Sequence, residues 1–262
     1  MNFKDKVVIV TGASSGIGAA VAIQFAAEGA KLALVGRNLD KLRTTSIRCK
    51  EKGSETLIIT ADITKDEDMR KIIIETIARF GQLHILINNA GKIAYSSILD
   101  ENALAVFDDI IATNLRSAFY LTHLAASHLI KTKGNIVNIS SAAALGILGT
   151  GIAAYNTSKA GLDHFTRSVA LELADEGVRV NVVNPGPVKT DLFTNMGTDK
   201  EYQERVFEVA VKGTALGRVS TSDDIANLVL FLASDKAASI TGSSYVADNG
   251  QLLLGLTKYD TV

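Results

Sequence analysis

The feature that most constrains this chain is a strict alternation of short apolar runs with longer helical patterns. Several runs are apolar at nearly every position, which is typical of parallel strands covered on both faces. We expect strands at Val7–Thr11, Lys31–Val35, Glu55–Thr60, Ile85–Asn88, Asn135–Ile139, Arg179–Val183 and Ser244–Ala247. The helical patterns between them are Gly18–Glu28, Leu39–Lys52, Lys65–Phe80, Ala103–Lys131, Ala154–Glu176 and Asp223–Ser234. The alternation predicts an α/β fold, a doubly wound parallel sheet of seven strands with helices on both faces.

The chain has 262 residues and no linker, repeat or low-complexity tract, so we expect one domain over residues 1–262. Its single cysteine, Cys49, excludes an intrachain disulfide and suits a reducing, cytoplasmic compartment. The formal net charge is −1 and basic residues are spread along the chain, which excludes nucleic acid and anionic membranes as expected partners. Neither a secretory signal nor a membrane span is recognisable, and no metal site is expected.

A glycine-rich loop, Thr11-Gly12-Ala13-Ser14-Ser15-Gly16-Ile17-Gly18, separates the first strand from the first helical pattern. Glycines allow the backbone to approach a pyrophosphate, and a helix N-terminus offers N–H donors and a positive dipole end. The order of strand, loop and helix predicts a dinucleotide site, although the same loop is compatible with a turn that merely needs glycine.

The end of the second strand bears on the choice of cofactor. A carboxylate there would accept the ribose 2′-hydroxyl and repel a 2′-phosphate, but this strand ends Val35-Gly36-Arg37-Asn38. Arg37 is suited to pair with a 2′-phosphate, the alternative being a solvated arginine. We therefore favour NADP(H), with NAD(H) as the alternative.

Tyr155 and Lys159 are four residues apart at the start of a helical pattern, which places both side chains on one face. A neighbouring ammonium lowers the pKa of a phenol, so Tyr155 is suited to exchange a proton with a carbonyl or alcohol oxygen. Ser141, at the end of the fifth strand, is placed to hold that oxygen, unless it only forms a turn. Asn114 lies inside a long helical pattern, where it either bends the helix, binds water or has no function.

Both prolines of the chain, Pro185 and Pro187, follow the sixth strand at the carboxyl edge of the sheet, where open α/β sheets bind ligands. The stretch from Lys189 to Gly217 lacks a strand and contains a short helical pattern at Lys200–Val211. We interpret residues 189–217 as a lid over the site.

At this point the residues match a known family. The chain resembles the short-chain dehydrogenase/reductases, which are Rossmann-fold enzymes, over nearly its full length. The matching motifs are Thr11-Gly12 with Gly16 and Gly18, Asp62, Asn88-Asn89-Ala90-Gly91, Asn114, Ser141, Tyr155 with Lys159, and Pro185-Gly186 with Thr190. Within the family it is similar to the 3-oxoacyl-carrier-protein reductases and the hydroxysteroid dehydrogenases.

The resemblance implies a role for each matching residue. Tyr155 would be the general acid/base, Lys159 would bind the nicotinamide ribose, Ser141 would position the substrate carbonyl, and Asn114 would hold a water in a proton relay to Lys159. The implied cofactor contacts are Gly12, Ser14, Ser15, Gly16, Ile17, Gly18, Arg37, Asp62, Ile63, Asn89, Ala90, Gly91, Pro185, Gly186, Val188 and Thr190, together with Tyr155 and Lys159. The resemblance also implies a homotetramer.

One departure concerns the loop between the serine and the tyrosine. Residues 142–154 are one residue longer than is usual in the family, which leaves Ser140 as an alternative to Ser141. This loop carries no charge, and the lid contributes Leu192, Phe193, Met196 and Phe207. We therefore expect an apolar small-molecule ketone or secondary alcohol as substrate, with a loop buried against the lid as the other explanation.

Two further functions stay open. A 3-oxoacyl substrate on an acidic carrier protein would need a basic patch, for which Lys131, Lys133 and Arg167 are candidates, diluted by Glu172, Asp175 and Glu176. A regulatory protein that binds the nucleotide without turnover is also compatible with the fold. The presence of the full set Asn114, Ser141, Tyr155 and Lys159 argues against it.

Overall fold

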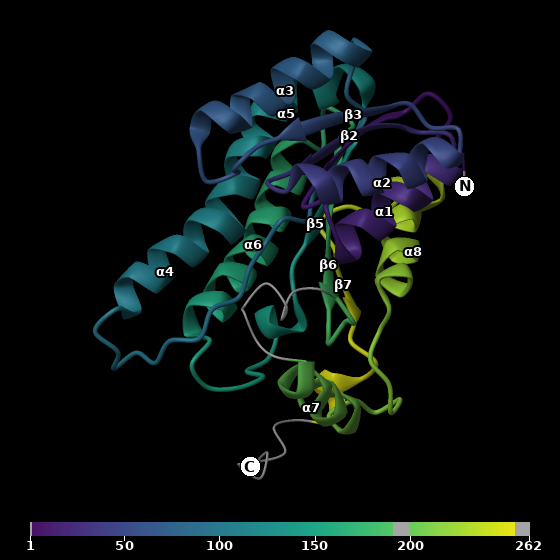
Figure 1. The fold of residues 1–262 in the computed structure, drawn as a ribbon. Coiled ribbons are helices and arrows are strands. Elements are labelled where there is room, and N and C mark those ends of the chain that lie inside the picture. The colour runs from purple at the N-terminus through teal and green to yellow at the C-terminus, as the bar shows by residue number, and fades with distance from the viewer. Residues whose placement is uncertain (1, 191–199, 255–262) are drawn as a thin grey trace.

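The computed structural model describes residues 2–190 and 200–254 (Figure 1). The strands are β1 (Val7–Thr11), β2 (Lys31–Gly36), β3 (Thr56–Thr60), β4 (Ile85–Asn88), β5 (Asn135–Ile139), β6 (Arg179–Pro185) and β7 (Ser244–Ala247). The helices are α1 (Gly16–Ala27), α2 (Leu39–Glu51), α3 (Asp66–Phe80), α4 (Ala103–Ile111), α5 (Ser117–Thr132), α6 (Ala153–Glu172), α7 (Lys200–Lys212) and α8 (Ser222–Ala233).

Within the described residues, seven strands form one sheet in the order β3-β2-β1-β4-β5-β6-β7, and every pair is parallel. The predicted doubly wound sheet is therefore confirmed. The strand order reverses between β1 and β4, so the loops that follow these two strands diverge to opposite sides and leave a crevice.

Side-chain alternation along the strands creates two cores. In β1, Val8 and Val10 pack under α1, α2 and α8, whereas Val7 and Ile9 pack under α3, α5 and α6. All four side chains are at most 1% exposed. The two helical layers lie on either side of the sheet in Figure 1, so burial on both faces explains the continuous apolar runs.

The predicted long helical pattern Ala103–Lys131 is wrong as a single regular helix. A π-helical turn at Ala112–Arg116 separates α4 from α5, and α4 projects away from the sheet (Figure 1). Asn114 is the buried residue of this turn. Such turns insert one extra residue per helical turn and often mark functional positions.

Smaller differences occur at element ends. β6 runs two residues past the predicted Val183 to Pro185, and α6 ends at Glu172 rather than Glu176. In α3 the first helical residue is Asp66, and the acidic first turn complements the helix dipole.

None of the helices in the described residues is both long and apolar enough to cross a membrane. The same part of the chain brings together no group of three or more His, Cys, Asp or Glu side chains able to hold a metal ion.

Candidate active site

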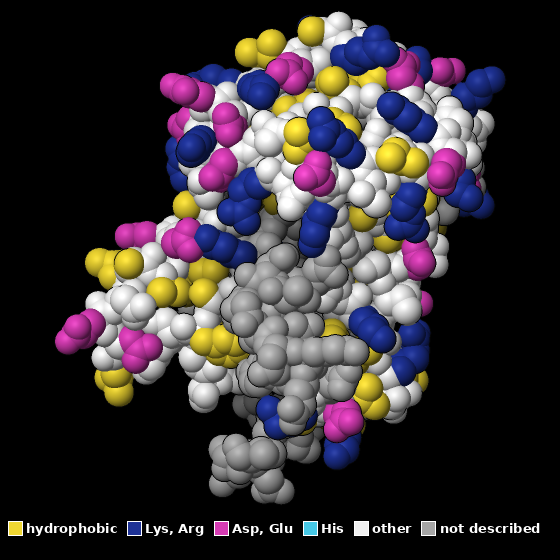
Figure 2. Space-filling model, in the orientation of Figure 1, with side chains coloured by type: hydrophobic (Ala, Val, Ile, Leu, Met, Phe, Trp, Pro, Cys, Tyr) yellow, Lys and Arg dark blue, Asp and Glu magenta, His cyan; other side chains and the backbone are white. Residues whose placement is uncertain are grey.

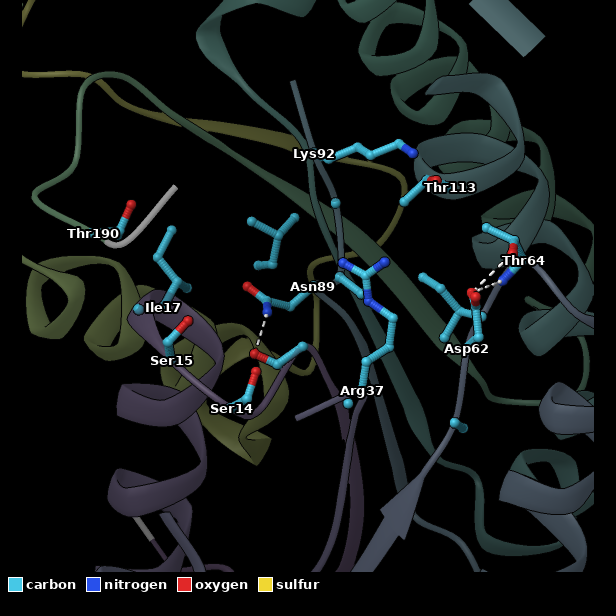
Figure 3. A pocket seen from close by; sticks show the side chains of 18 of the residues that line it. Ser14, Ser15, Ile17, Arg37, Asp62, Thr64, Asn89, Lys92, Thr113 and Thr190 are labelled. Carbon is cyan, nitrogen blue, oxygen red and sulfur yellow. Dashed lines mark hydrogen bonds between the residues drawn. The ribbon is translucent and has the colours of Figure 1, made fainter. Parts of the chain in front are cut away.

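A cavity of about 330 Å³ opens at the carboxyl ends of β1, β4 and β5, in the crevice where the strand order reverses. Of the residues predicted to bind cofactor or substrate, the following line it: Gly12, Ser14, Ser15, Gly16, Ile17, Arg37, Asp62, Ile63, Asn89, Ala90, Gly91, Tyr155, Lys159 and Thr190. Figure 3 shows the glycine loop on one side of this cavity, Asp62 and Thr64 on the other, and Arg37 between them.

The glycine loop is shaped by close approaches that leave no room for side chains. A Cβ atom on Gly12, whose φ is +67°, would lie 2.8 Å from Nδ2 of Asn89, and one on Gly16 would lie 3.2 Å from Thr190. Asn89 fixes the loop, since its Nδ2 donates to the carbonyl of Thr11 at 2.8 Å. The first turn of α1 carries no acidic side chain, and the hydroxyl of its N-cap Ser15 makes no capping bond to the helix. The backbone N–H groups at this helix N-terminus fit a pyrophosphate.

Arg37, Asp62 and Thr64 line the cavity across from the glycine loop. Oδ1 of Asp62 accepts hydrogen bonds from the backbone N–H of Thr64 at 3.0 Å and from its hydroxyl at 2.8 Å. These bonds, with a smaller effect of Arg37, hold the pKa of Asp62 below its usual value. The side chain of Arg37 is exposed. Ser14 also lines a second, polar cavity, together with Lys41, Arg48 and Lys189.

Tyr155 and Lys159 lie on successive turns at the start of α6. Nζ of Lys159 is 5.8 Å from the centre of the Tyr155 ring, and it donates to the carbonyl of Ile139 at 2.9 Å. Lys159 is only 4% exposed, and it lines the cavity as a buried side chain. A Cβ on Gly91 would lie 3.3 Å from this Nζ, so the loop after β4 passes close to the lysine.

The structure distinguishes the two serines. β5 ends at Ile139, and successive extended residues point to opposite sides. The hydroxyl of Ser140 is buried and donates to the carbonyl of Lys159 at 3.1 Å. The hydroxyl of Ser141 hydrogen-bonds Tyr155 and accepts from the N–H of Ala143 at 3.1 Å. Ser141 is therefore the serine that acts on the phenol, whereas Ser140 and not Ser141 is among the residues that line the cavity.

The predicted lowering of the Tyr155 pKa is not found in the protein alone. Burial raises the pKa of Tyr155, and the hydrogen bond of Ser141 opposes this only in part. Burial also lowers the pKa of Lys159 to about 8, although the charge of Asp163 acts in the opposite direction. A buried lysine with a lowered pKa carries its positive charge over a smaller pH range than an ordinary lysine does.

Comparison with known proteins decides the family. A family model described as enoyl-(acyl carrier protein) reductase matches residues 12–251. A 3-oxoacyl-[acyl-carrier-protein] reductase of Staphylococcus epidermidis is 34% identical over 95% of this chain and 100% of that protein. A cyclohexanol dehydrogenase of an Acinetobacter species is 31% identical over 94% of each chain. The crystal structure of a short-chain dehydrogenase/reductase of unknown function from Caenorhabditis elegans, solved with cofactor, covers 97% of each chain at 33% identity, with a TM-score of 0.90.

The chain belongs to the short-chain dehydrogenase/reductase family. It is accordingly an oxidoreductase of a family that uses a nicotinamide cofactor.

Several residues expected to contact cofactor in this short-chain dehydrogenase/reductase do not line the cavity. Gly18 lies beneath the loop, and a Cβ there would come 2.3 Å from the carbonyl oxygen of Gly12. Gly186 packs on Asp248, where a Cβ would lie 2.6 Å from Cα. Val188 forms an isolated parallel bridge with Ser220. Gly18 and Gly186 therefore serve close packing, and Pro185, which ends β6, lies outside the lining as well.

Asn114 is 2% exposed and fully engaged with protein groups. Its Oδ1 accepts from the N–H of Lys92 at 2.9 Å, and its Nδ2 donates to the carbonyl of Lys92 at 2.8 Å and to the hydroxyl of Ser158 at 3.1 Å. The side chain thus connects the π-helical turn and α6 to the loop after β4. A water relay through Asn114 stays a prediction.

Sequence reasoning missed Lys92, Asp163 and Asn184. Lys92 directly follows the Asn-Asn-Ala-Gly motif, lines the cavity and forms an ion pair with Asp109 of α4. Asp163 lies one helical turn after Lys159, and Asn184 directly precedes Pro185. Both are fully buried beneath Ser141. Their positions next to matching motifs were the only available signal.

The loop between β5 and α6, which ends just before Tyr155, carries no charged side chain. A Cβ on Gly146 would lie 2.6 Å from Leu252, and one on Gly151 would lie 3.8 Å from the ring of Tyr95. Leu145 and Ile147 are 50% and 60% exposed. The loop after β5 therefore contacts the 3₁₀ turn Gln251–Leu253 and the loop after β4. Of the predicted lid, residues 191–199 lie outside the described residues; α7 is present and the side chain of Phe207 is partly buried.

The basic residues considered for a carrier protein lie far from the site in the same chain. Lys131 and Lys133 are at the end of α5, next to the amino end of β5, whereas Tyr155 lies at the carboxyl edge. Arg167 is twelve residues along α6 from Tyr155, a rise of about 18 Å.

Proposed function

We propose that this protein is an NADP(H)-dependent reductase or dehydrogenase that interconverts an uncharged, apolar ketone and its secondary alcohol. The observation that carries the proposal is one continuous cavity, with the glycine loop and Arg37 at one end and Tyr155, Lys159 and the nearby Ser141 at the other. The nicotinamide, when bound, supplies or accepts the hydride.

The protein's own groups move and hold the proton. In the reducing direction the Tyr155 hydroxyl donates its proton to the carbonyl oxygen while the hydroxyl of Ser141 hydrogen-bonds the same oxygen. In the oxidising direction the phenolate takes the proton of the alcohol. Because burial raises the pKa of Tyr155, the positive charges of Lys159 and of an oxidised nicotinamide are needed to favour the phenolate.

The preference for an apolar substrate rests on the uncharged loop that leads into α6 just before Tyr155. Leu145 and Ile147 of this loop are exposed, and the loop contacts Leu252 and Tyr95, which carry no charge. An ionic substrate would lose hydration there without gaining a partner. That the Acinetobacter relative is named a cyclohexanol dehydrogenase supports this substrate class.

The preference for NADP(H) rests on charge. β2 does not end in an acidic residue. Arg37 points into the cavity between the glycine loop and Asp62 (Figure 3). Lys41, Arg48 and Lys189 line a second cavity on the other side of Ser14. A 2′-phosphate would meet positive charge from two directions.

The test is the loss of absorbance of the reduced nicotinamide with NADPH or NADH, against cyclic ketones, steroid ketones and a 3-oxoacyl thioester. We expect turnover of the ketones with NADPH. Turnover with NADH alone would refute the cofactor assignment, and tight NADPH binding without turnover on any substrate would favour the regulatory alternative.

A second candidate function is the reduction of 3-oxoacyl groups carried by an acidic protein. The Staphylococcus relative named as such a reductase, which this chain matches over its whole length, favours it. Activity confined to the acyl thioester in the same panel would place this candidate first.

We also propose a cytoplasmic homotetramer. Leu104, Phe107 and Phe119 are 71%, 37% and 58% exposed along α4 and α5, and hydrophobic side chains gather over the projecting α4 (Figure 2). Leu253 is 85% exposed near the C-terminus. Patches of this kind mark subunit contacts. Sedimentation that shows only monomer at micromolar concentration would refute the assembly.

A further inference from the structure

A buried carboxylate lies directly beneath the proposed catalytic groups without touching the cavity. Asp163 is 2% exposed, sits on α6 one turn after Lys159, and is not among the residues that line the cavity. Burying a carboxylate is costly unless hydrogen bonds or opposite charges compensate it. The groups that compensate Asp163 therefore indicate what it does.

Asn184 links this carboxylate to Ser141. Nδ2 of Asn184 donates to Oδ2 of Asp163 at 2.8 Å and to the backbone carbonyl of Ser141 at 3.1 Å. A side-chain amide nitrogen carries two hydrogens, so both bonds form at once. Asn184 has no exposed surface, and its place in β6 is fixed by the ladder with β7. The bridge thus ties the backbone of Ser141 to α6.

The second connection runs along α6 to Lys159. Residues four apart on a helix are neighbours, and the negative charge of Asp163 raises the pKa of Lys159 against the effect of burial. In return Lys159, Arg167 and hydrogen bonds from Ser140 and Asn184 partly offset the raised pKa that burial gives Asp163. Both proposed catalytic partners of Tyr155 therefore depend on this one side chain.

We infer that Asp163 is a positioning residue whose carboxylate, through Asn184, fixes the backbone of Ser141 and whose negative charge supports the ammonium of Lys159. This inference rests on the proposed function, in which Ser141 and Lys159 act on the phenol of Tyr155.

Among the other charged groups around this cluster, Arg167 acts on Asp163, and several others are paired with residues outside it. On the elements packed against α6, the charged and titratable residues are Lys92, Asp108, Asp109, Arg116, Arg179 and Tyr245, and on α6 itself they are Tyr155, His164, Arg167 and Glu172. Lys92 pairs with Asp109, and Arg116 pairs with Asp66 of α3. Arg179 lies at the opposite end of β6 and donates to the carbonyls of Leu232, Ile240 and Ser234. Asp163 is the acid whose charge acts on Lys159.

Two variants separate the two roles. Asp163→Asn keeps an oxygen that can accept from Asn184 but removes the charge, so Lys159 should lose its proton at lower pH, by about one unit. The fall of kcat/KM on the alkaline side, where Lys159 becomes neutral, should move down by the same amount. Asn184→Ala keeps the charge but removes the bridge, so kcat should fall about ten- to a hundredfold as the Ser141 hydroxyl loses its place, with the titration of Lys159 unchanged.

The experiment combines steady-state kinetics with NMR on the full-length protein. The ¹³Cε signal of Lys159, assigned with Lys159→Arg, is titrated in wild type and Asp163→Asn. With carbonyl-¹³C serine and ¹⁵N alanine, only the two Ser-Ala pairs, Ser117-Ala118 and Ser141-Ala142, give signals. Asn184→Ala should shift the second pair and leave the first, an internal reference, in place. Glu172→Gln removes an exposed charge from the same helix and should change neither signal nor turnover.

The outcomes are distinct. An unshifted Lys159 titration in Asp163→Asn overturns the charge role. In Asn184→Ala, an unshifted Ser141-Ala142 signal or a kcat within about twofold of wild type overturns the bridge. A lower melting temperature with unchanged signals would mean that both residues are merely structural, and would also overturn the inference. If wild type turns over no substrate, the proposed function fails by itself, while the NMR readouts still decide whether Asp163 controls these two groups.

Discussion

The two ends of the cavity are built in different ways. The nucleotide end consists of backbone turns and half-exposed side chains from contiguous motifs, such as the glycine loop and the Asp62–Thr64 turn. The catalytic end joins Tyr155, Lys159 and Ser141 from two segments, over buried polar groups from β6 and α6. The nucleotide end should therefore respond to substitution in graded steps, whereas the catalytic end should respond as a unit.

The largest expected effect on turnover is that of Tyr155→Phe. Removing the hydroxyl deletes the proton donor but leaves the nucleotide end intact, so kcat should fall by about 10²–10⁴-fold. The dissociation constant for NADPH, measured by fluorescence titration, should stay within a few-fold of wild type. Unchanged turnover would remove Tyr155 from the mechanism.

A second effect is expected in the pH dependence of folding. Lys159 keeps its proton to an ordinary pKa of 10.5 in the unfolded chain but only to about 8 when folded. Between these values the unfolded state binds more protons, so the contribution of Lys159 to the free energy of unfolding rises with pH, on the order of 2–3 kcal/mol across the window.

Urea unfolding of wild type and Lys159→Met without cofactor would measure this. The variant should gain most in relative stability below pH 8, and the gain should shrink toward pH 10.5. Lys212→Met, at the end of α7, removes a lysine outside the cavity and should show no such window. A difference between wild type and Lys159→Met that is independent of pH would contradict the lowered pKa.

At the nucleotide end, Gly18→Ala tests whether packing beneath the loop shapes the site. The new methyl would collide with the carbonyl of Gly12 and with Asn89, so we expect a loss of about 1–3 kcal/mol in stability together with weaker NADPH binding. Gly149→Ala is the matched control, since nothing lies within 4 Å of its Cβ position. Equal melting temperatures for the two variants would refute the packing role.

The smallest expected effect concerns the choice of cofactor. Arg37→Ala should lower the ratio of kcat/KM for NADPH to that for NADH about tenfold, because an exposed arginine contributes modestly to binding a phosphate. Arg43→Ala, an exposed arginine on α2 paired with Asp40, should leave the ratio as it is. If Arg37→Ala also leaves the ratio unchanged, either Lys41, Arg48 and Lys189 bind the 2′-phosphate or no residue distinguishes the two cofactors.

The alternation of runs, the glycine loop and the Tyr155–Lys159 spacing could be found in the sequence because each is a local pattern with a fixed geometric consequence. Seven strands were predicted within a few residues of their bounds for this reason. The choice of Ser141 over Ser140 depended on where β5 ends, and only the contacts of each hydroxyl settle which one faces the phenol.

Other features depend on contacts between distant segments, which local patterns do not encode. Gly134 is suited by sequence to cap α5 in the left-handed conformation, yet Lys133 takes it, with φ of +50°. Gly134 is instead needed because a Cβ there would lie 2.4 Å from the carbonyl of His84, fifty residues away. The π-helical turn at Asn114 likewise follows from its bonds to Lys92 and Ser158.

Periodicity and turn chemistry act within a few residues, so the sequence was enough to predict the parallel sheet and the order of strands and helices along the chain. The electrostatics around Tyr155 and Lys159 depends on contacts that form only when the chain is folded. The pKa of Lys159, the direction of the Tyr155 shift and the link from Asp163 through Asn184 to Ser141 all arise from burial and from polar contacts between strands and helices far apart in the chain.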